Sequence, residues 1–335
     1  MTPSATILGC EGPVLLASEA AFFREAAPWG FILFARNVET PDQLRRLTDD
    51  LRDAVGREAL ITVDQEGGRV QRLRAPHWRE WLPPLDQMDR VAPASRERSV
   101  WLRYRLIAEE LRAVGIDSNC APSGDIAVDE THPFLKNRCF GRDVQAVVAA
   151  ARASADGLLA GGVLPILKHI PGHGRATLDS HIDLPRTDAA PDTLWRTDFA
   201  AFRALAGLPI GMTAHIVFPA FDDRPSTQSP QMIDLIRRDI GFDGLLVTDD
   251  LSMEALSGDL GTRAARAIAA GCDIALYCKG VPAEAEAVVA AAGAMTASAL
   301  ARADAALARR QAPEPIDTAL LEAELEALLQ GRGHV

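Results

Sequence analysis

Eight short apolar runs recur along the chain, and they constrain its fold more than any other feature. Most of them end at polar or charged residues and are bounded by glycine, proline or aspartate. Runs of this length are too short for helices, so they predict buried strands. The strands are expected at residues 6–9, 31–34, 60–63, 116–120, 164–167, 210–213, 245–247 and 274–277.

Segments with helical periodicity separate most of these runs. They span residues 41–55, 96–114, 143–160, 192–205 and 262–270. Thr40 is a candidate cap for the first of them, with Pro41 at its first position. The alternation fits both a (β/α)8 barrel and a doubly wound sheet. A length of 335 residues suits a barrel, and no G-x-G-x-x-G follows a strand, so we expect a single (β/α)8 TIM barrel over residues 1–335.

Two further segments are expected to decorate this barrel. The proline-rich stretch 75–86 is predicted to be a loop insertion rather than a linker between domains. A final amphipathic helix places Leu321, Leu325 and Leu328 on one face. We expect that apolar stripe to pack on the barrel rather than on a second copy of the chain, which favours a monomer.

The composition narrows the class of partner. Hydrophobic residues make up 48% of the chain and charged residues 24%, as in soluble globular proteins. A net charge of -11 argues against binding to nucleic acid or to an anionic membrane surface. Five cysteines without CxxC spacing, no apolar run long enough to span a bilayer and no signal-peptide pattern predict a cytoplasmic protein with reduced thiols.

Charged side chains follow several of the predicted strands. In a barrel the carboxyl ends of the strands form the active site, so these side chains are the first candidates. Any one of them could equally cap a helix or form an ion pair. The candidates are Asp64, Lys168 with His169, His215, and Asp249 with Asp250.

The densest polar segment is KHIPGHGRATLDSH, at residues 168–181. His169 and His173 have a metal-binding spacing, but the Pro-Gly pair between them is incompatible with a regular helix, so a zinc site is less favoured. Lys168 could form a Schiff base, although it lies beside His169 and near Arg138 in a site that we expect to bind polar oxygens. Asp179 and His181 fit better as a coupled carboxylate and imidazole that transfer protons near neutral pH.

At this point the sequence resembles a known family. The segment 168–181 is similar to the K-H-(F)-P-G-H-G-x4-D-S-H motif of bacterial β-N-acetylglucosaminidases of glycoside hydrolase family 3, with Ile170 where the family usually has an aromatic residue. LIRRDIGFDGLLVTDDLS, at residues 235–252, matches the nucleophile signature of that family. GFILFARNVETPDQL at 30–44 and TVDQEGGRVQR at 62–72 are also similar to this subgroup.

The resemblance implies a retaining exo-glycosidase that releases terminal β-1,4-linked N-acetylglucosamine from muropeptides during peptidoglycan recycling. Asp249 would be the nucleophile, since only the signature distinguishes it from Asp250, and His181 oriented by Asp179 would be the acid/base. The resemblance implies sugar binding by Asp64, Arg72, Arg138, Lys168 and His169, with no cofactor and no metal.

Three other functions stay open. The first is a metal-dependent barrel hydrolase that uses His169, His173, His181 and Asp249 as ligands. The second is a different family 3 specificity, either a β-glucosidase or a phosphorylase in which phosphate replaces water as the acceptor. The third is a sugar-binding barrel without catalysis, which an intact nucleophile and an intact Asp-His pair disfavour.

Overall fold

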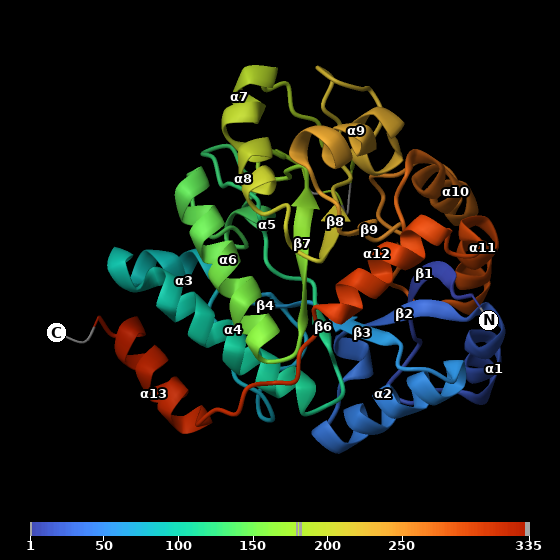
Figure 1. Ribbon diagram of the computed structural model, residues 1–335, viewed down its shortest axis with the longest axis horizontal. Coiled ribbons are helices and arrows are strands. Elements are labelled where there is room, and N and C mark those ends of the chain that lie inside the picture. The colour runs from blue at the N-terminus through green and yellow to red at the C-terminus, as the bar shows by residue number, and fades with distance from the viewer. Residues whose placement is uncertain (1, 179, 181–182, 332–335) are drawn as a thin grey trace.

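A computed structural model describes residues 2–178, 180 and 183–331. Eight parallel strands pair in the order β10-β1-β2-β3-β6-β7-β8-β9, and a parallel bridge between Val247 and Ile274 links the two ends of this order. The sheet therefore closes into a (β/α)8 barrel, and the doubly wound alternative is wrong (Figure 1). The strands are β1 Ser4–Gly9, β2 Pro28–Leu33, β3 Leu60–Val63, β6 Ser118–Asn119, β7 Leu164–Ile170, β8 Ile210–Thr213, β9 Leu245–Val247 and β10 Ala275–Tyr277.

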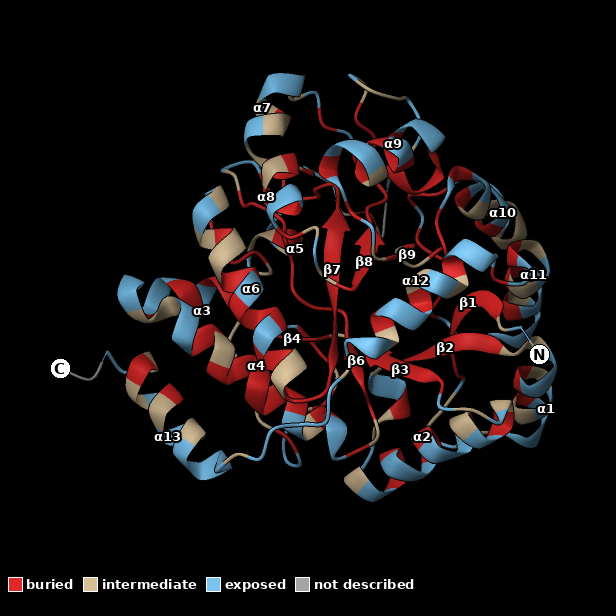
Figure 2. Cartoon of the chain, in the orientation of Figure 1, coloured by how far each residue is buried: buried red, intermediate tan, exposed pale blue. Residues whose placement is uncertain are grey.

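All eight predicted strands are present, and helices surround them. Buried residues fill the strands and the inner faces of the helices, whereas the outer faces are exposed (Figure 2). The larger helices are α1 Ala17–Ala26, α2 Pro41–Val55, α4 Arg96–Arg112, α6 Val144–Ala160, α10 Leu260–Ala270, α11 Pro282–Ala292 and α12 Ala297–Ala308. The Thr40 side chain accepts a hydrogen bond from the Gln43 backbone N–H, so the predicted cap of α2 is confirmed.

One predicted helix is divided into two. The segment 192–205 forms α7 Pro191–Arg196 and α8 Asp198–Ala204, because Thr197 between them has φ −123° and ψ −91°. The Thr197 hydroxyl donates either to the Thr193 carbonyl or to the Asp198 carboxylate, with 2.7 Å to each acceptor. Threonine competes in this way with regular helical bonding, which the apolar periodicity alone does not reveal.

A short hairpin follows β3 and was not predicted. It consists of β4 Gln65–Gly67 and β5 Val70–Gln71, paired antiparallel. Gly67 and Gly68 both have positive φ, at 110° and 58°, which suits the tight reversal between the two strands. The proline-rich insertion continues from this hairpin, but its last three residues, which were predicted as loop, form the start of α3 Pro84–Arg90.

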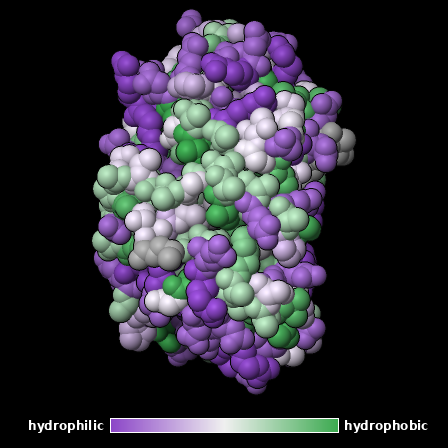
Figure 3. All heavy atoms as spheres, turned by 90° about the vertical axis from the view of Figure 1, so that its right-hand side faces the viewer, coloured by the Kyte–Doolittle hydropathy of each residue, from purple (hydrophilic) through white to green (hydrophobic). Residues whose placement is uncertain are grey.

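The final helix, α13 Thr318–Leu329, packs against α4 as expected. Leu325 and Leu328 are buried, and Glu324 accepts two hydrogen bonds of 2.7 Å from Arg98 of α4. The face on the right of Figure 1, near α10 and α11, carries apolar and polar side chains intermixed (Figure 3). Across the described ranges, no helix is both long enough and apolar enough to cross a membrane.

Candidate active site

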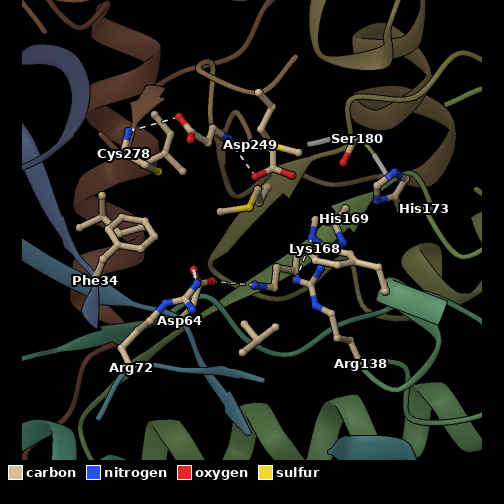
Figure 4. A pocket seen from close by; sticks show the side chains of 17 residues that line it. Phe34, Asp64, Arg72, Arg138, Lys168, His169, His173, Ser180, Asp249 and Cys278 are labelled. Atoms are coloured by element: carbon tan, nitrogen blue, oxygen red, sulfur yellow. Dashed lines mark hydrogen bonds and ion pairs between the residues drawn. The ribbon is translucent and has the colours of Figure 1, made fainter. Parts of the chain in front are cut away.

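A polar pocket lies where the carboxyl ends of the strands converge (Figure 4). Six residues predicted from the sequence line it together, although they come from distant parts of the chain. These are Asp64, Arg72, Arg138, Lys168, His169 and Asp249. The other two predicted site residues, Asp179 and His181, lie outside the described residues, whereas Ser180 between them lines the pocket.

Asp64 directly follows β3 and pairs with two cations. The Lys168 ammonium lies 2.9 Å from one carboxylate oxygen, and the Arg72 guanidinium lies 3.0 Å from the other. Burial of Asp64 opposes its ionisation, but Lys168 and Arg72 outweigh that penalty and hold its pKa well below the usual range. Asp64 is therefore an ionised hydrogen-bond acceptor at the pocket wall.

Glu66 is a second buried carboxylate that the sequence reasoning missed. It lies on β4 and receives two hydrogen bonds from Arg138, of 2.8 and 3.0 Å, and an ion pair of 2.6 Å from Lys168. Burial opposes ionisation, but Arg138 and Lys168 lower the Glu66 pKa to about 2. The carboxylate thus fixes the direction of both cations, since a bidentate pair holds a guanidinium in one plane. The available signal in the sequence was the position of Glu66 within TVDQEGG, two residues after Asp64.

Asp125 is another functional candidate that the sequence reasoning missed. One of its oxygens lies 2.7 Å from His169 Nδ1, and the other accepts the His173 backbone N–H at 2.7 Å. Burial of Asp125 is outweighed by His169 and His173, so its pKa is held well below the usual range. An ionised carboxylate only accepts, so Nδ1 carries the proton, and Nε2 of His169 lies 3.4 Å from Arg138.

The two adjacent aspartates after β9 differ in their surroundings. The Asp250 carboxylate accepts hydrogen bonds from the Ser252 hydroxyl at 2.6 Å, the Ser252 N–H at 3.0 Å and the Cys278 N–H at 3.2 Å. Among described residues, the Asp249 carboxylate accepts one bond, from the Asp250 N–H at 2.8 Å. Asp250 is occupied in holding its loop, whereas Asp249 remains available to a ligand.

Electrostatics separates the same two aspartates. Burial raises the Asp250 pKa, despite the hydrogen bonds from Ser252. Burial of Asp249 is outweighed by the nearby His169 and His215, the Asp250 N–H and Lys168, which together lower its pKa below the ordinary value. Asp249 is therefore ionised at neutral pH, as a nucleophile must be.

His215 was a candidate because it follows β8, but the structure gives it a supporting position. Its Nε2 lies 3.0 Å from the Asp250 carbonyl, and its Nδ1 lies 2.8 Å from the Thr227 hydroxyl. A carbonyl only accepts, so Nε2 donates, whereas the Thr227 hydroxyl also lies 3.0 Å from the Ala214 carbonyl and has one hydrogen to donate between its partners. Both ring nitrogens are thereby satisfied, and His215 holds the loop that carries the two aspartates.

Apolar side chains complete the pocket, chiefly Phe34, Met212, Met253 and Leu276. The Arg72 guanidinium carbon lies 5.3 Å from the centre of the Phe34 ring. Among the described residues, no group of three or more His, Cys, Asp or Glu side chains is arranged to hold a metal ion. His181, one ligand of the metal alternative, lies outside those residues.

Comparisons with known proteins identify the family. The model of the glycosyl hydrolase family 3 N-terminal domain matches residues 24–309. A β-hexosaminidase from Methylococcus capsulatus is 39% identical over 288 residues, which cover 83% of this chain and 84% of that protein. A β-hexosaminidase from Methylobacillus flagellatus is 37% identical over 288 residues, with 83% and 81% covered.

A solved structure agrees with these relatives. NagZ from Neisseria gonorrhoeae in complex with N-trifluoroacetyl-D-glucosamine superposes with a TM-score of 0.83, at 29% identity over 98% of this chain and 97% of that chain. The resemblance drawn from the four sequence motifs is therefore confirmed. The chain belongs to glycosyl hydrolase family 3, and the relatives described above are β-hexosaminidases of similar length.

Proposed function

We propose that the protein is a retaining exo-β-N-acetylglucosaminidase that removes terminal β-1,4-linked N-acetylglucosamine from muropeptides. The β-hexosaminidase relatives support the reaction, and the bound N-trifluoroacetyl-D-glucosamine of the gonococcal structure supports the sugar. One observation carries the mechanism: an ionised, accessible Asp249 shares a pocket with a fixed group of charged hydrogen-bonding side chains (Figure 4).

In the first step, an Asp249 carboxylate oxygen bonds to the anomeric carbon while the bond from that carbon to the leaving oxygen breaks. The leaving oxygen takes a proton from His181, and a covalent glycosyl-enzyme results. In the second step, His181 takes a proton from water, whose oxygen bonds to the anomeric carbon as the ester to Asp249 breaks. Two displacements at one carbon retain its configuration.

The proposed acid/base is an imidazole rather than the second carboxyl of the general scheme for retaining enzymes. The acid must begin protonated while Asp249 is ionised. An imidazolium is attracted to that carboxylate, whereas a second carboxylate would be repelled. Asp179, two residues before His181, would orient the ring and favour its charged form.

The charged wall of the pocket suits sugar hydroxyls. Charge-assisted hydrogen bonds are shorter and stronger than neutral ones, and they are directional. Asp64 would accept from hydroxyl groups, while Lys168, Arg138 and Arg72 would donate to their oxygens. His169 donates through Nδ1 to Asp125, which directs its Nε2 to the pocket side.

A panel of nitrophenyl glycosides tests this proposal. The N-acetylglucosaminide should be cleaved with a kcat/KM well above that of the glucoside, and phosphate should not replace water as acceptor. Preferred cleavage of the glucoside would indicate a β-glucosidase, and release of a sugar phosphate would indicate a phosphorylase. No cleavage of any glycoside would leave the sugar-binding alternative.

The covalent step has its own test. A 2-deoxy-2-fluoro or 5-fluoro glycoside should add one glycosyl mass to the peptide that contains Asp249, and Asp249→Asn should not be labelled. Labelling of Asp250 instead would overturn the assignment. Turnover of purified muropeptides, followed by mass spectrometry, tests the proposed role in cell-wall recycling. For that role we propose a monomeric, cytoplasmic enzyme.

A further inference from the structure

His173 lines the candidate pocket but has no role in the mechanism above. Its side chain is buried, with 2% of the residue exposed. Neither ring nitrogen has a hydrogen-bond partner, as far as the described part of the chain extends. Buried polar groups almost always have a partner, so an imidazole with two unpaired nitrogens calls for a functional explanation.

Among the residues that the structure describes, the contacts that hold the His173 ring in place use neither ring nitrogen. The His173 backbone N–H donates to the Asp125 carboxylate at 2.7 Å, which fixes the backbone at His173. The ring packs edge to face on His169, with 5.4 Å between ring centres and 68° between planes. His215 provides the contrast, because both of its nitrogens are satisfied although it is equally buried.

The surroundings keep His173 neutral. Burial and the neighbouring His169 lower its pKa to about 3, and the opposing effects of Asp125 and Asp249 are smaller. Arg138 also acts against the charged form. A neutral imidazole offers one N–H donor and one lone pair, so it can bond to a hydroxyl in either direction.

Among the residues that line the pocket, Ser180 is best suited to bond to that imidazole. It is buried, it lines the same pocket, and Figure 4 shows it at the same edge of the pocket as His173. Its backbone carbonyl accepts a hydrogen bond of 3.2 Å from the Ala255 N–H, which ties it to the loop that follows β9. In the sequence it stands between Asp179 and His181, the proposed acid/base pair.

We propose that His173 is a positioning residue that bonds to the Ser180 hydroxyl in the substrate-bound enzyme and thereby sets the position of the adjacent acid/base residues. The inference rests on the proposed function. It explains why an imidazole lies at a position where packing alone would be satisfied by an apolar ring. Because His173 would act through the acid/base, its effect should depend on how much the leaving group needs a proton.

The test compares His173→Phe, Ser180→Ala and the double variant on two substrates. With N,N′-diacetylchitobiose, whose leaving group needs a proton, each single variant should lower kcat about 10- to 100-fold with little change in KM. With the 2,4-dinitrophenyl glycoside, whose leaving group does not, the glycosylation rate should fall less than about threefold. His77→Gln, at an exposed histidine, is the control with unchanged rates.

Two further measurements complete the experiment: the energetic coupling between His173 and Ser180, and the melting temperature of each variant. If the two residues act through one bond, the double variant should be no slower than the slower single variant, and His173→Gln should recover part of the rate. His173→Phe should keep or raise the melting temperature because it removes unpaired nitrogens, whereas His215→Phe should lower it.

Equal slowing of both substrates, or independent multiplication of the two single effects, would overturn the inference while leaving the glycosidase intact. A lower melting temperature for His173→Phe would also overturn it, since the ring would then be structural. Failure of the wild-type protein to cleave any N-acetylglucosaminide would instead refute the proposed function.

Discussion

Replacing Glu66 with glutamine removes the buried charge that holds Arg138 and Lys168 while keeping the shape of the side chain. The wild-type Glu66 pKa falls from 4.5 to about 2 because Arg138 and Lys168 outweigh the effect of burial. A lowering of this size corresponds to about 3 kcal/mol of folding free energy at neutral pH. Loss of one partner from a buried ion pair has a similar cost.

The pH dependence of this contribution follows from the direction of the shift. A carboxyl group with a lowered folded-state pKa stabilises the protein above the unfolded pKa of 4.5, and the effect is lost as the pH falls toward 2. Between pH 7 and pH 3 the wild type should lose roughly 2 kcal/mol of this contribution. Glutamine cannot titrate, so the difference in free energy of unfolding between the wild type and Glu66→Gln should narrow by that amount.

Urea denaturation followed by circular dichroism at pH 7 and pH 3 measures both quantities. Glu80→Gln is the matched control, since Glu80 pairs with Arg74 at 2.7 Å on the surface and should contribute less than about 1 kcal/mol. A Glu66→Gln cost below about 1 kcal/mol, or one that does not change with pH, would refute the reasoning. We also expect KM to rise roughly tenfold, because Arg138 and Lys168 lose their fixed direction.

Three further outcomes are expected. Asp249→Asn should lower kcat for the N-acetylglucosaminide by more than about 10³-fold. In the wild type, the acid limb of the kcat/KM profile should lie below pH 3.8, because the Asp249 pKa is lowered from that value. An acid limb near pH 6 would contradict this assignment. Asp125→Asn should raise KM about tenfold, because His169 Nδ1 loses the carboxylate to which it donates. Steady-state kinetics would measure this change, and an unchanged KM would argue against that role of Asp125. Dialysis against EDTA should leave the hydrolysis rate unchanged, and a loss restored by Zn²⁺ would favour the metal-dependent alternative.

Local pattern accounts for most of the barrel. Every strand was predictable because both faces of a barrel strand are buried, which produces a short continuous apolar run. The start of α2 was predictable because Thr40 and Pro41 act within one turn of the chain. The division between α7 and α8 was not, because it depends on the side-chain bonds of Thr197 rather than on apolar periodicity.

The site was predictable only in part. Six of its residues were named in advance: five lie in motifs that are contiguous in the sequence, and Arg138 was named from the family resemblance. Glu66 and Asp125 were not named, although Glu66 lies within the motif at 62–72. Their roles depend on distant partners: Glu66 meets Arg138 72 residues away, and Asp125 meets His169 44 residues away. Nothing near either carboxylate in the chain indicates which cation or imidazole it will reach.

The sequence by itself determined the alternation of strands and helices, the family, and the set of side chains available for chemistry, because apolar period and motif are local properties. The tertiary structure decided what each of those side chains does. Within the part of the chain that the structure describes, it occupied Asp250 with three hydrogen bonds and left Asp249 available, and it buried the His173 ring without a hydrogen-bond partner. Burial and hydrogen bonding depend on neighbours that only the closed barrel brings together.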